Sequence, residues 1–270
     1  MISHTPGKVI VAAHRGVSGA NIPCNSKTAF NIALSQGADI VELDVTRSSD
    51  GELFVFHPGM EKPHLNLDVN LGELTAKEIS KIRYVNQDNV PTSHIITPLS
   101  EMLEFLRDKS YINVDKYAKY MEEIVHTIRK VGVEKQVIGK VPHNEQHLDK
   151  IAKIAPDIAF MPVIWHKDAY TEMALERDVN YIGVEALFDS EDDEIVSDKY
   201  IGDMHSKGLL VYGNAIVYDE NDVISAGHTD DISLSGNPDH GWGWFVDKKF
   251  DVIQTDWCGM LKNYLNTRNK

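Results

Sequence analysis

Residues 39–57 read DIVELDVTRSSDGELFVFH, and the rest of the predicted sheet is arranged around this segment. It contains two runs typical of β-strands, 39–45 and 53–57, in which Val, Ile, Leu and Phe predominate. The segment 46–52 between them is too short for the helical crossover that two parallel strands need. The second run must therefore return antiparallel to the first, and the Asp-Gly dipeptide at 50–51 favours a hairpin turn there.

The position of this turn decides which residues of the two strands face each other. If the turn is centred on Ser49 and Asp50, the pairing places His57 opposite Glu42. Directly opposed residues point to the same face of a sheet, so this register predicts that His57 and Glu42 lie side by side. A loop with an odd number of residues would shift the pairing by one position.

Outward from the hairpin, short β-branched runs alternate with longer amphipathic segments such as 98–109 and 117–131, whose apolar residues recur at helical spacing. Strands that alternate with helices predict a parallel sheet, and about eight such units predict a closed barrel. The expected fold is an α/β TIM (β/α)8 barrel with an extra antiparallel strand. The expected barrel strands are 9–13, 39–45, 111–115, 136–140, 158–163, 181–185, 208–213 and 251–255, and the extra strand is 53–57.

Residues 58–97 break this alternation. A segment of this length between barrel strands is usually functional, so we predict a small insertion at the barrel mouth; a tolerated surface excursion is the alternative. The chain has 270 residues, close to the roughly 250 of a typical single barrel. We therefore expect one domain over 1–270, with 58–97 as an insertion subdomain.

Composition excludes several classes of partner. Lys and Arg number 27 against 41 Asp and Glu, a net charge of −14, so no nucleic-acid partner is expected. The longest apolar runs are far too short to span a bilayer, and the first residues lack a secretory signal, so we expect a cytoplasmic protein without stable membrane insertion. Cys24 and Cys258 are the only cysteines, so no disulfide framework is implied. The oligomeric state stays open.

Polar residues gather at the ends of the first two predicted strands. His14 and Arg15 directly follow the first strand, and Glu42 and Asp44 close the second. The carboxyl ends of barrel strands face the active site, so both groups should open into one pocket. Glu42 and Asp44 are two residues apart on a strand and share a face, where they repel each other unless a cation lies between them. Oxygen ligands select a hard ion, so we expect one divalent cation, Mg²⁺ or Ca²⁺.

The runs AHRG, GADIVELDV and DGELFVFHP within residues 12–58 resemble the amino-terminal signature of glycerophosphodiester phosphodiesterases. A weaker likeness, FDVIQTDW at 250–257, matches the family's final strand and the Thr-Asp that follows it. Between these regions only the rhythm of strands and helices agrees. The resemblance implies a TIM barrel in which 58–97 corresponds to the family's characteristic insertion.

The resemblance also implies roles for individual residues. His14 and His57 would be the catalytic acid/base pair, and Glu42 and Asp44 would bind the metal ion. Arg15 would contact the phosphate of the substrate.

The chain departs from the family pattern at three positions. Cys24 stands where the family usually has Glu. The third metal ligand is usually Glu, where this chain has the shorter Asp115, and the family's Lys two positions later is replaced by Tyr117. Lys116 would normally point to the other face of its strand. Lys140, which ends the next strand, is therefore the candidate substrate-binding replacement.

Two further acidic residues lie at strand ends. Glu185 ends its predicted strand as Asp115 does, and it could add a carboxylate at the mouth. Asp256 lies just past the last strand, where a role as N-cap of the final helix is expected.

Three other patterns are weaker indications of function. His143 and His147 are four residues apart, but a zinc-protease helix needs Glu directly after the first His, where this chain has Asn144; a polar helix start is expected instead. The acidic stretch 219–222 lacks the glycine of a calcium loop and is expected to be an exposed loop. The Trp-containing segment 236–245 could either shape the mouth or pack a helix end.

Together these features predict metal-dependent hydrolysis of a small glycerophosphodiester to an alcohol and glycerol 3-phosphate, with two histidines as acid and base. One alternative is a catalytically silent barrel that binds phosphodiesters or metal. Another is a related phospholipase D- or C-like barrel enzyme.

Overall fold

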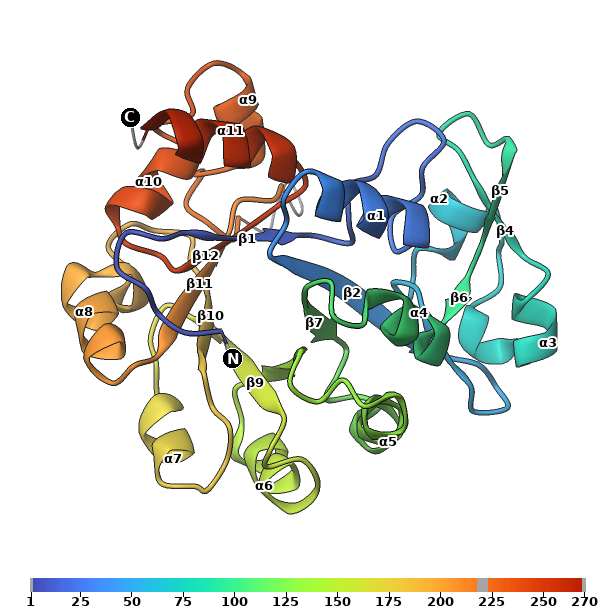
Figure 1. Ribbon diagram of the computed structural model, residues 1–270, viewed down its shortest axis with the longest axis horizontal. Helices are drawn as coiled ribbons and strands as arrows, with labels where there is room; N and C mark the ends of the chain where they lie inside the picture. Colours follow the sequence, from blue (N-terminus) through green and yellow to red (C-terminus); the bar gives the residue numbers. More distant parts are fainter. Residues whose placement is uncertain (1, 218–222, 269–270) are drawn as a thin grey trace.

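The computed structural model describes residues 2–217 and 223–268, and its centre is a closed parallel barrel (Figure 1). The hydrogen-bonded order is β1-β12-β11-β10-β9-β8-β7-β2, and pairing of β1 with β2 closes the ring. This confirms the predicted TIM barrel. The eight strands are β1 (Ile10–Ala13), β2 (Ile40–Arg47), β7 (Tyr111–Asp115), β8 (Val137–Pro142), β9 (Ala159–Trp165), β10 (Gly183–Leu187), β11 (Leu210–Asn214) and β12 (Val252–Thr255).

Helices surround the strands on the outside, as the alternating sequence pattern requires (Figure 1). They are α1 (Lys27–Ser35), α4 (Leu99–Leu106), α5 (Met121–Val131), α6 (Glu145–Ile154), α7 (Thr171–Leu175), α8 (Asp198–Ser206), α9 (Asp230–Leu234), α10 (Trp242–Asp247) and α11 (Cys258–Arg268), with a short 3₁₀ turn η2 (Glu194–Val196).

Helix α5 illustrates how the sequence pattern places these helices. It buries Met121, Ile124 and Ile128 on one face, and Gly132 ends it in the left-handed conformation that favours glycine. The helix begins at Met121 rather than at the predicted residue 117, because residues 116–120 form turns.

Alternate residues of each strand enter two different hydrophobic cores. Val11, Val41 and Leu43 face outward and pack in the main core with the helices. Ala12 and Tyr212 belong to a second cluster, which is drawn almost entirely from the strands and fills the inside of the barrel. The same alternation turns Glu42 and Asp44 toward one side of β2, which is how this strand delivers two carboxylates to one place.

The predicted hairpin is present, but its register differs by one residue. The turn is centred on Ser49 and Asp50 as expected, since the amide of Gly51 donates to the carbonyl of Ser48. Gly51 then takes a positive φ of 95° and bulges out, so that Ser48 pairs with Glu52. The loop thus has an odd number of residues, and the predicted pairing of His57 with Glu42 is wrong. Backbone pairing instead brings Phe56 to Asp44.

Residues 58–97 form a small lobe on the outer side of this hairpin (teal to green in Figure 1). β3 (Leu53–Val55) pairs with β2 and with β6 (Thr97–Pro98), so both ends of the lobe attach to the part of β2 beyond Asp44, at the barrel mouth. The lobe has its own hydrophobic cluster, which includes Tyr84 and Phe56. Its elements are α2 (Glu61–Leu65), η1 (Leu71–Glu73), α3 (Ala76–Ile79), β4 (Arg83–Val85) and β5 (Pro91–Ile95).

Two expectations concern segments outside this core. The predicted exposed loop at 219–222 lies outside the described residues. No helix formed by the described residues is long and apolar enough to cross a lipid bilayer.

Candidate active site

A pocket of about 340 Å³ opens at the carboxyl ends of the barrel strands. Six of the seven site residues expected from the sequence line it, and the seventh, Asp44, lies directly behind them. No residue of 58–97 is among its lining, so the insertion stands beside the pocket rather than over it. The lining residues are His14, Arg15, Glu42, His57, Asp115, Lys116, Lys140, Val163, Trp165, Glu185, Leu187, Asn214, Ile216, Ile224 and Gln254.

The turn after β1 positions the first two of these residues. Arg15 and Gly16 both have positive φ, 54° and 79°. A Cβ atom on Gly16 would lie 2.7 Å from the carbonyl carbon of Ala29 in α1, so only glycine fits this turn. Ser26 caps α1 by accepting from the amide of Ala29, and it thereby fixes the helix that the turn packs against.

Three carboxylates meet at the wall formed by β2 and β7. Oxygens of Glu42, Asp44 and Asp115 all lie within 4.8 Å of one another. The parallel register of the two strands pairs Asp44 directly with Asp115, so the cluster follows from the sheet itself. Glu42 and Asp44 are almost completely buried.

Burial and mutual repulsion make this cluster a strong acceptor for positive charge. Burial, with the nearby Asp44 carboxylate, raises the pKa of Glu42 to about 7. Arg15 compensates in part, because its Nε lies 3.0 Å from Oδ2 of Asp44 and its amide donates to Glu42 over 3.0 Å. Among the described residues, Oδ1 of Asp44 is buried without a hydrogen-bond partner. An all-oxygen donor set with a free buried oxygen fits a hard divalent cation.

Asp115 is held by two lysines. Burial favours its neutral form, but the ammonium groups of Lys140 and Lys116 outweigh this effect and hold the pKa of Asp115 well below its ordinary value. Lys116 takes a positive φ of 62°, folds back, and places Nζ 2.7 Å from Oδ2 of Asp115. The expectation that Lys116 points to the other face is therefore wrong, because the residue lies past the end of the strand, where strand alternation no longer applies.

Glu185 forms an ion pair instead of standing free at the mouth. Its Oε2 lies 3.0 Å from Nζ of Lys140, and both side chains are buried. Asn214 donates to the other oxygen of Glu185 over 2.9 Å, and Gln254 donates to Asn214. This chain of contacts crosses the pocket floor and holds Lys140 in place.

Asp256 differs from the helix cap that the sequence predicted. Its carboxylate does not cap the final helix but lies 2.8 Å from Nδ1 of His14. Burial opposes the charged form of His14, yet the hydrogen bond to Asp256 and the Glu42 carboxylate outweigh burial and raise the pKa of His14. The contact could have been expected, because the first and last strands of a closed barrel must be neighbours.

His57 reaches the same pocket from the far end of the hairpin. Its Nε2 lies 3.9 Å from Oδ1 of Asp44. Burial lowers the pKa of His57, and the cations of Arg15 and Lys116 lower it further, against the opposing carboxylate of Asp44. The two histidines thus line one pocket with their pKa values displaced in opposite directions.

Asn25 was not expected to contribute to the site. It is buried, donates to Oδ2 of Asp44 over 2.9 Å and accepts from the backbone amide of Asp44. Its place in the order Pro-Cys-Asn-Ser, which resembles a segment of the family signature, was the signal for it. Cys24, at the position where the family usually has Glu, lies beside Asn25, with its sulfur 3.9 Å from Nε2 of His64 in the lobe.

The half of the pocket that faces the charged cluster is apolar. This side carries five apolar side chains from β9, β10 and the segment after β11: Val163, Trp165, Leu187, Ile216 and Ile224. The segment 236–245 does not contribute to it. Its Trp242 donates to buried Asp230, and its Trp244 stacks on His228, so this segment packs the outer layer.

Comparison with known proteins gives the same fold and points to one family. A crystal structure of a glycerophosphoryl diester phosphodiesterase from Parabacteroides distasonis superposes with a TM-score of 0.82 over 98% of this chain and 89% of that one, at 16% identity. An Oleispira antarctica phosphodiesterase, solved with the product sn-glycerol-3-phosphate, gives a TM-score of 0.66 over 95% and 96% of the chains, at 17% identity.

Two curated sequences are more similar. The glycerophosphodiester phosphodiesterase of Caldanaerobacter subterraneus subsp. tengcongensis is 30% identical over 165 residues, which are 56% of this chain and 65% of that protein, slightly less than two thirds of its length. The enzyme of the same name from Bacillus altitudinis is 30% identical over 173 residues, 59% of this chain and 70% of that protein. Residues 160–265 also match a family model described as a domain of unknown function, DUF4996. With a barrel of this fold and a relative aligned over more than two thirds of its length, the chain belongs to the glycerophosphodiester phosphodiesterase family.

Proposed function

We propose that this chain hydrolyses glycerophosphodiesters to an alcohol and glycerol 3-phosphate, and that it requires one divalent cation, Mg²⁺ or Ca²⁺. The observation that carries the proposal is the convergence of two imidazoles and three carboxylates on one pocket. Family membership supports the same reaction class.

Glu42, Asp44 and Asp115 are the residues that would hold the cation. Their oxygens are close enough to share one ion. Burial and the neighbouring Asp44 carboxylate raise the pKa of Glu42, so added positive charge would favour its ionised form. When bound, the cation neutralises charge on the phosphodiester and orients it for attack.

Positively charged side chains would hold the phosphate group itself. Arg15 is fixed between Asp44 and Glu42, and its guanidinium can form charge-assisted hydrogen bonds to a phosphate oxygen. Lys140 reaches the pocket from its ion pair with Glu185 and is our candidate for a second phosphate contact.

The two histidines would move the protons. One removes a proton from the attacking hydroxyl, and the other delivers a proton to the departing alcohol oxygen. Asp256 fixes the ring of His14 through Nδ1, which leaves Nε2 for the substrate. His57 lines the same pocket, with its Nε2 3.9 Å from Oδ1 of Asp44.

The size of the pocket fits a small substrate. Its volume of about 340 Å³ lies near the lower end of the range for small-molecule sites. The structural neighbour from Oleispira antarctica binds sn-glycerol-3-phosphate, the product that the proposed reaction would release. A cytoplasmic location and a place in glycerol and lipid metabolism belong to the same proposal, and the two free cysteines are compatible with a reducing compartment.

The test is a screen of the purified chain against glycerophosphodiesters with different alcohols, each with Mg²⁺, Ca²⁺ or a chelator. We expect turnover that requires a cation. His14→Ala and His57→Ala should each lower kcat by about 10²- to 10⁴-fold with little change in KM, because proton transfer acts only in the transition state. His126→Ala, on the outer surface of α5, is the matched control.

Two outcomes would count against the proposal. If either histidine variant keeps wild-type turnover, the acid/base assignment is wrong. If the wild-type chain binds the cation but hydrolyses none of the esters, the protein is a silent binder, a reading that Cys24, Asp115 and Tyr117 would then explain.

A further inference from the structure

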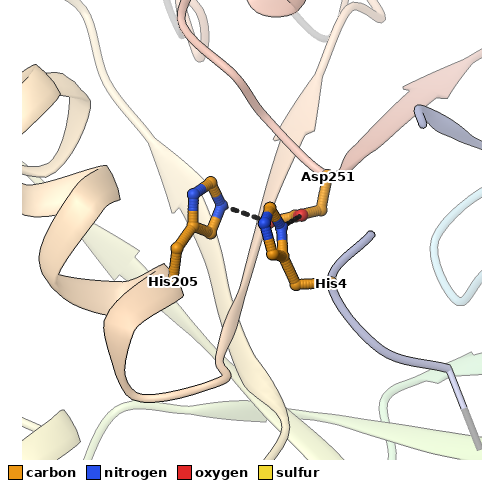
Figure 2. Close-up of side chains that lie close together, drawn as sticks. All are labelled: His4, His205 and Asp251. Atoms are coloured by element: carbon orange, nitrogen blue, oxygen red, sulfur yellow. Dashed lines mark hydrogen bonds and ion pairs between the residues drawn. The ribbon is translucent and has the colours of Figure 1, made fainter. Parts of the chain in front are cut away.

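A second cluster of metal-binding side chains lies at the opposite end of the barrel from the pocket. His4 comes from the segment before β1, His205 from α8, and Asp251 immediately precedes β12 (Figure 2). Asp256, which contacts the pocket residue His14, follows the same strand β12. The three side chains therefore meet at the amino-terminal end of the barrel strands, although they are far apart in sequence.

The geometry brings two imidazole nitrogens to one carboxylate. Nδ1 of His4 lies 2.5 Å from Oδ1 of Asp251, and Nε2 of His205 lies 2.9 Å from Oδ2. One ligand atom from each residue lies within 4.8 Å of the other two. The rings stack with centroids 3.8 Å apart, so both nitrogens approach the carboxylate from the same side (Figure 2).

The carboxylate is rigidly held and has no other charged partner among the described residues. Asp251 is 3% exposed, and its Oδ2 also accepts from the backbone amide of Val211 over 2.8 Å. Among residues 2–217 and 223–268, the ion pairs of Asp251 are with His4 and His205 alone. A buried carboxylate with two imidazoles and no lysine or arginine on it is a site where a cation can replace the imidazole protons.

The kind of donor atom selects the class of metal. Two nitrogens and one oxygen suit a borderline ion such as Zn²⁺, whereas Mg²⁺ and Ca²⁺ prefer oxygen alone. Zinc binds such atoms at about 2.0–2.2 Å, and the three ligand atoms, one from each residue, already lie within 4.8 Å of one another. A cavity of about 350 Å³ borders all three side chains and gives an ion and a water ligand access to them.

We propose that His4, His205 and Asp251 bind one Zn²⁺, and that the ion fastens the segment before β1 across the amino-terminal end of the barrel strands. That segment already closes the barrel, since Ile2 is 8% exposed and packs in the inner cluster with Leu210 and Val252. Figure 1 shows the same segment running over the strands from β1 toward the centre of the molecule. The zinc ion joins this closure to α8 and β12.

The rival is a metal-free clamp in which both histidines only donate hydrogen bonds to Asp251. Both hypotheses expect His4→Gln and His205→Gln to lower thermal stability, so stability alone does not separate them. They differ in the response to zinc. The proposed hydrolysis does not depend on this site, because the cluster lies at the other end of the barrel.

The experiment titrates Zn²⁺ into metal-depleted protein in the presence of excess Mg²⁺, which occupies the carboxylate cluster of the pocket. Calorimetry and the melting temperature are recorded for wild type, His4→Gln, His205→Gln and the surface control His126→Gln. We expect one equivalent of zinc and a rise in Tm for wild type and the control. Both site variants should bind zinc at least about 10-fold more weakly, with Mg²⁺-dependent turnover unchanged.

Co²⁺ provides a second readout, because its visible absorption reports ligation by the two imidazoles. The absorption should appear in wild type and be lost in His4→Gln, a change on the partly exposed terminal segment that keeps the test valid if His205→Gln fails to fold. The proposal is overturned if wild type binds no zinc under excess Mg²⁺, or if the variants bind it as tightly as wild type does.

Discussion

His14 and Asp256 are 242 residues apart in sequence, yet their side chains are 2.8 Å apart at the pocket. The strands that they follow are direct neighbours, since Ala13 pairs with Thr255. The site thus depends on contacts between residues that are far apart in the sequence and become neighbours only in the folded chain. In the proposed reaction Asp256 would act through His14, so we regard it as a positioning residue.

Asp256→Asn should lower kcat by about 10- to 100-fold with little effect on KM, because it removes the carboxylate that orients His14 and favours its charged form. The limb of the pH–rate profile that belongs to His14 should move to lower pH, since the pKa of His14 is raised partly by Asp256. Asp256→Glu should restore part of the rate. Asp189→Asn, an exposed change outside the pocket lining, is the control, and an unchanged pH profile in Asp256→Asn would contradict the role.

The residues that could be predicted from sequence are those that a strand places by alternation. Glu42, Asp44 and Asp115 lie on β2 and β7, and their common wall follows from the parallel register. Lys116 could not be placed in this way, because a left-handed residue after a strand end obeys no alternation. Asn25 was missed for a similar reason, since it lies in a turn and also has a positive φ.

At the scale of elements, all eight barrel strands and the antiparallel return were predictable from the alternation of strand and helix patterns. The register of the hairpin was not. The turn position was right, but the bulge at Gly51 depends on a single positive φ, which shifted every pair by one residue. His57 consequently stands near Asp44 rather than opposite Glu42.

The turn between β1 and α1 should be intolerant of any side chain at Gly16. Gly16→Ala places an alanine in the left-handed backbone conformation, which is unfavourable, and in addition brings its Cβ into a clash with Ala29. Gly7 has a similar φ of 75° with open space around it, so Gly7→Ala isolates the backbone cost. By urea unfolding we expect Gly7→Ala to cost about 1–2 kcal/mol, and Gly16→Ala to cost about 1–3 kcal/mol more. Equal losses would show that the turn can relax away from α1.

Asp230 joins three elements, because it accepts from Trp242 in α10, from Thr255 in β12 and from the amide of Asp256. Burial raises the pKa of Asp230 to about 6, against these hydrogen bonds, which lower it. A carboxyl whose pKa is higher in the folded state stabilises the fold when protonated. Its contribution is complete below about pH 4 and is lost as the pH rises through about 6.

Asp230→Asn mimics the protonated carboxyl and removes this titration. Wild type should therefore lose up to about 3 kcal/mol of unfolding free energy relative to Asp230→Asn between about pH 4 and 7. Urea unfolding of both proteins across this range measures the difference in unfolding free energy. The contributions of the other titrating groups cancel in this difference. A difference that does not vary with pH would contradict the assignment.

At the scale of the whole molecule, a net charge of −14 and a buried carboxylate cluster both oppose the compact state. That the whole chain forms one domain stays a prediction. The barrel itself was predictable from the alternation of strands and helices. Among the described residues its eight strands close into a ring with one core on each side, and β3 and β6 extend the sheet beyond β2.

Magnesium should stabilise the whole chain, because an ion that binds the folded state alone shifts the unfolding equilibrium. At 100-fold excess over Kd the gain is about 2.7 kcal/mol, or about 5–10 °C in Tm. Asp115→Asn should reduce the shift and lower activity together, and excess Mg²⁺ should recover part of the rate. Asp115→Glu, which restores the family's usual ligand, should keep both the stabilisation by Mg²⁺ and the activity. An unchanged shift in Asp115→Asn would mean that Asp115 is no ligand.

The adjacency of β1 and β12 also governs when the pocket can be completed during synthesis of the chain. The ribosome releases His14 early, together with the first strand of the sheet, but Asp256 leaves it only after all the other strands have been made. The strands β2 and β7, which carry the three carboxylates, have been made well before this point. The imidazole of His14 acquires its partner only when the last strand docks beside the first, so ring closure of the sheet and completion of the pocket are one event.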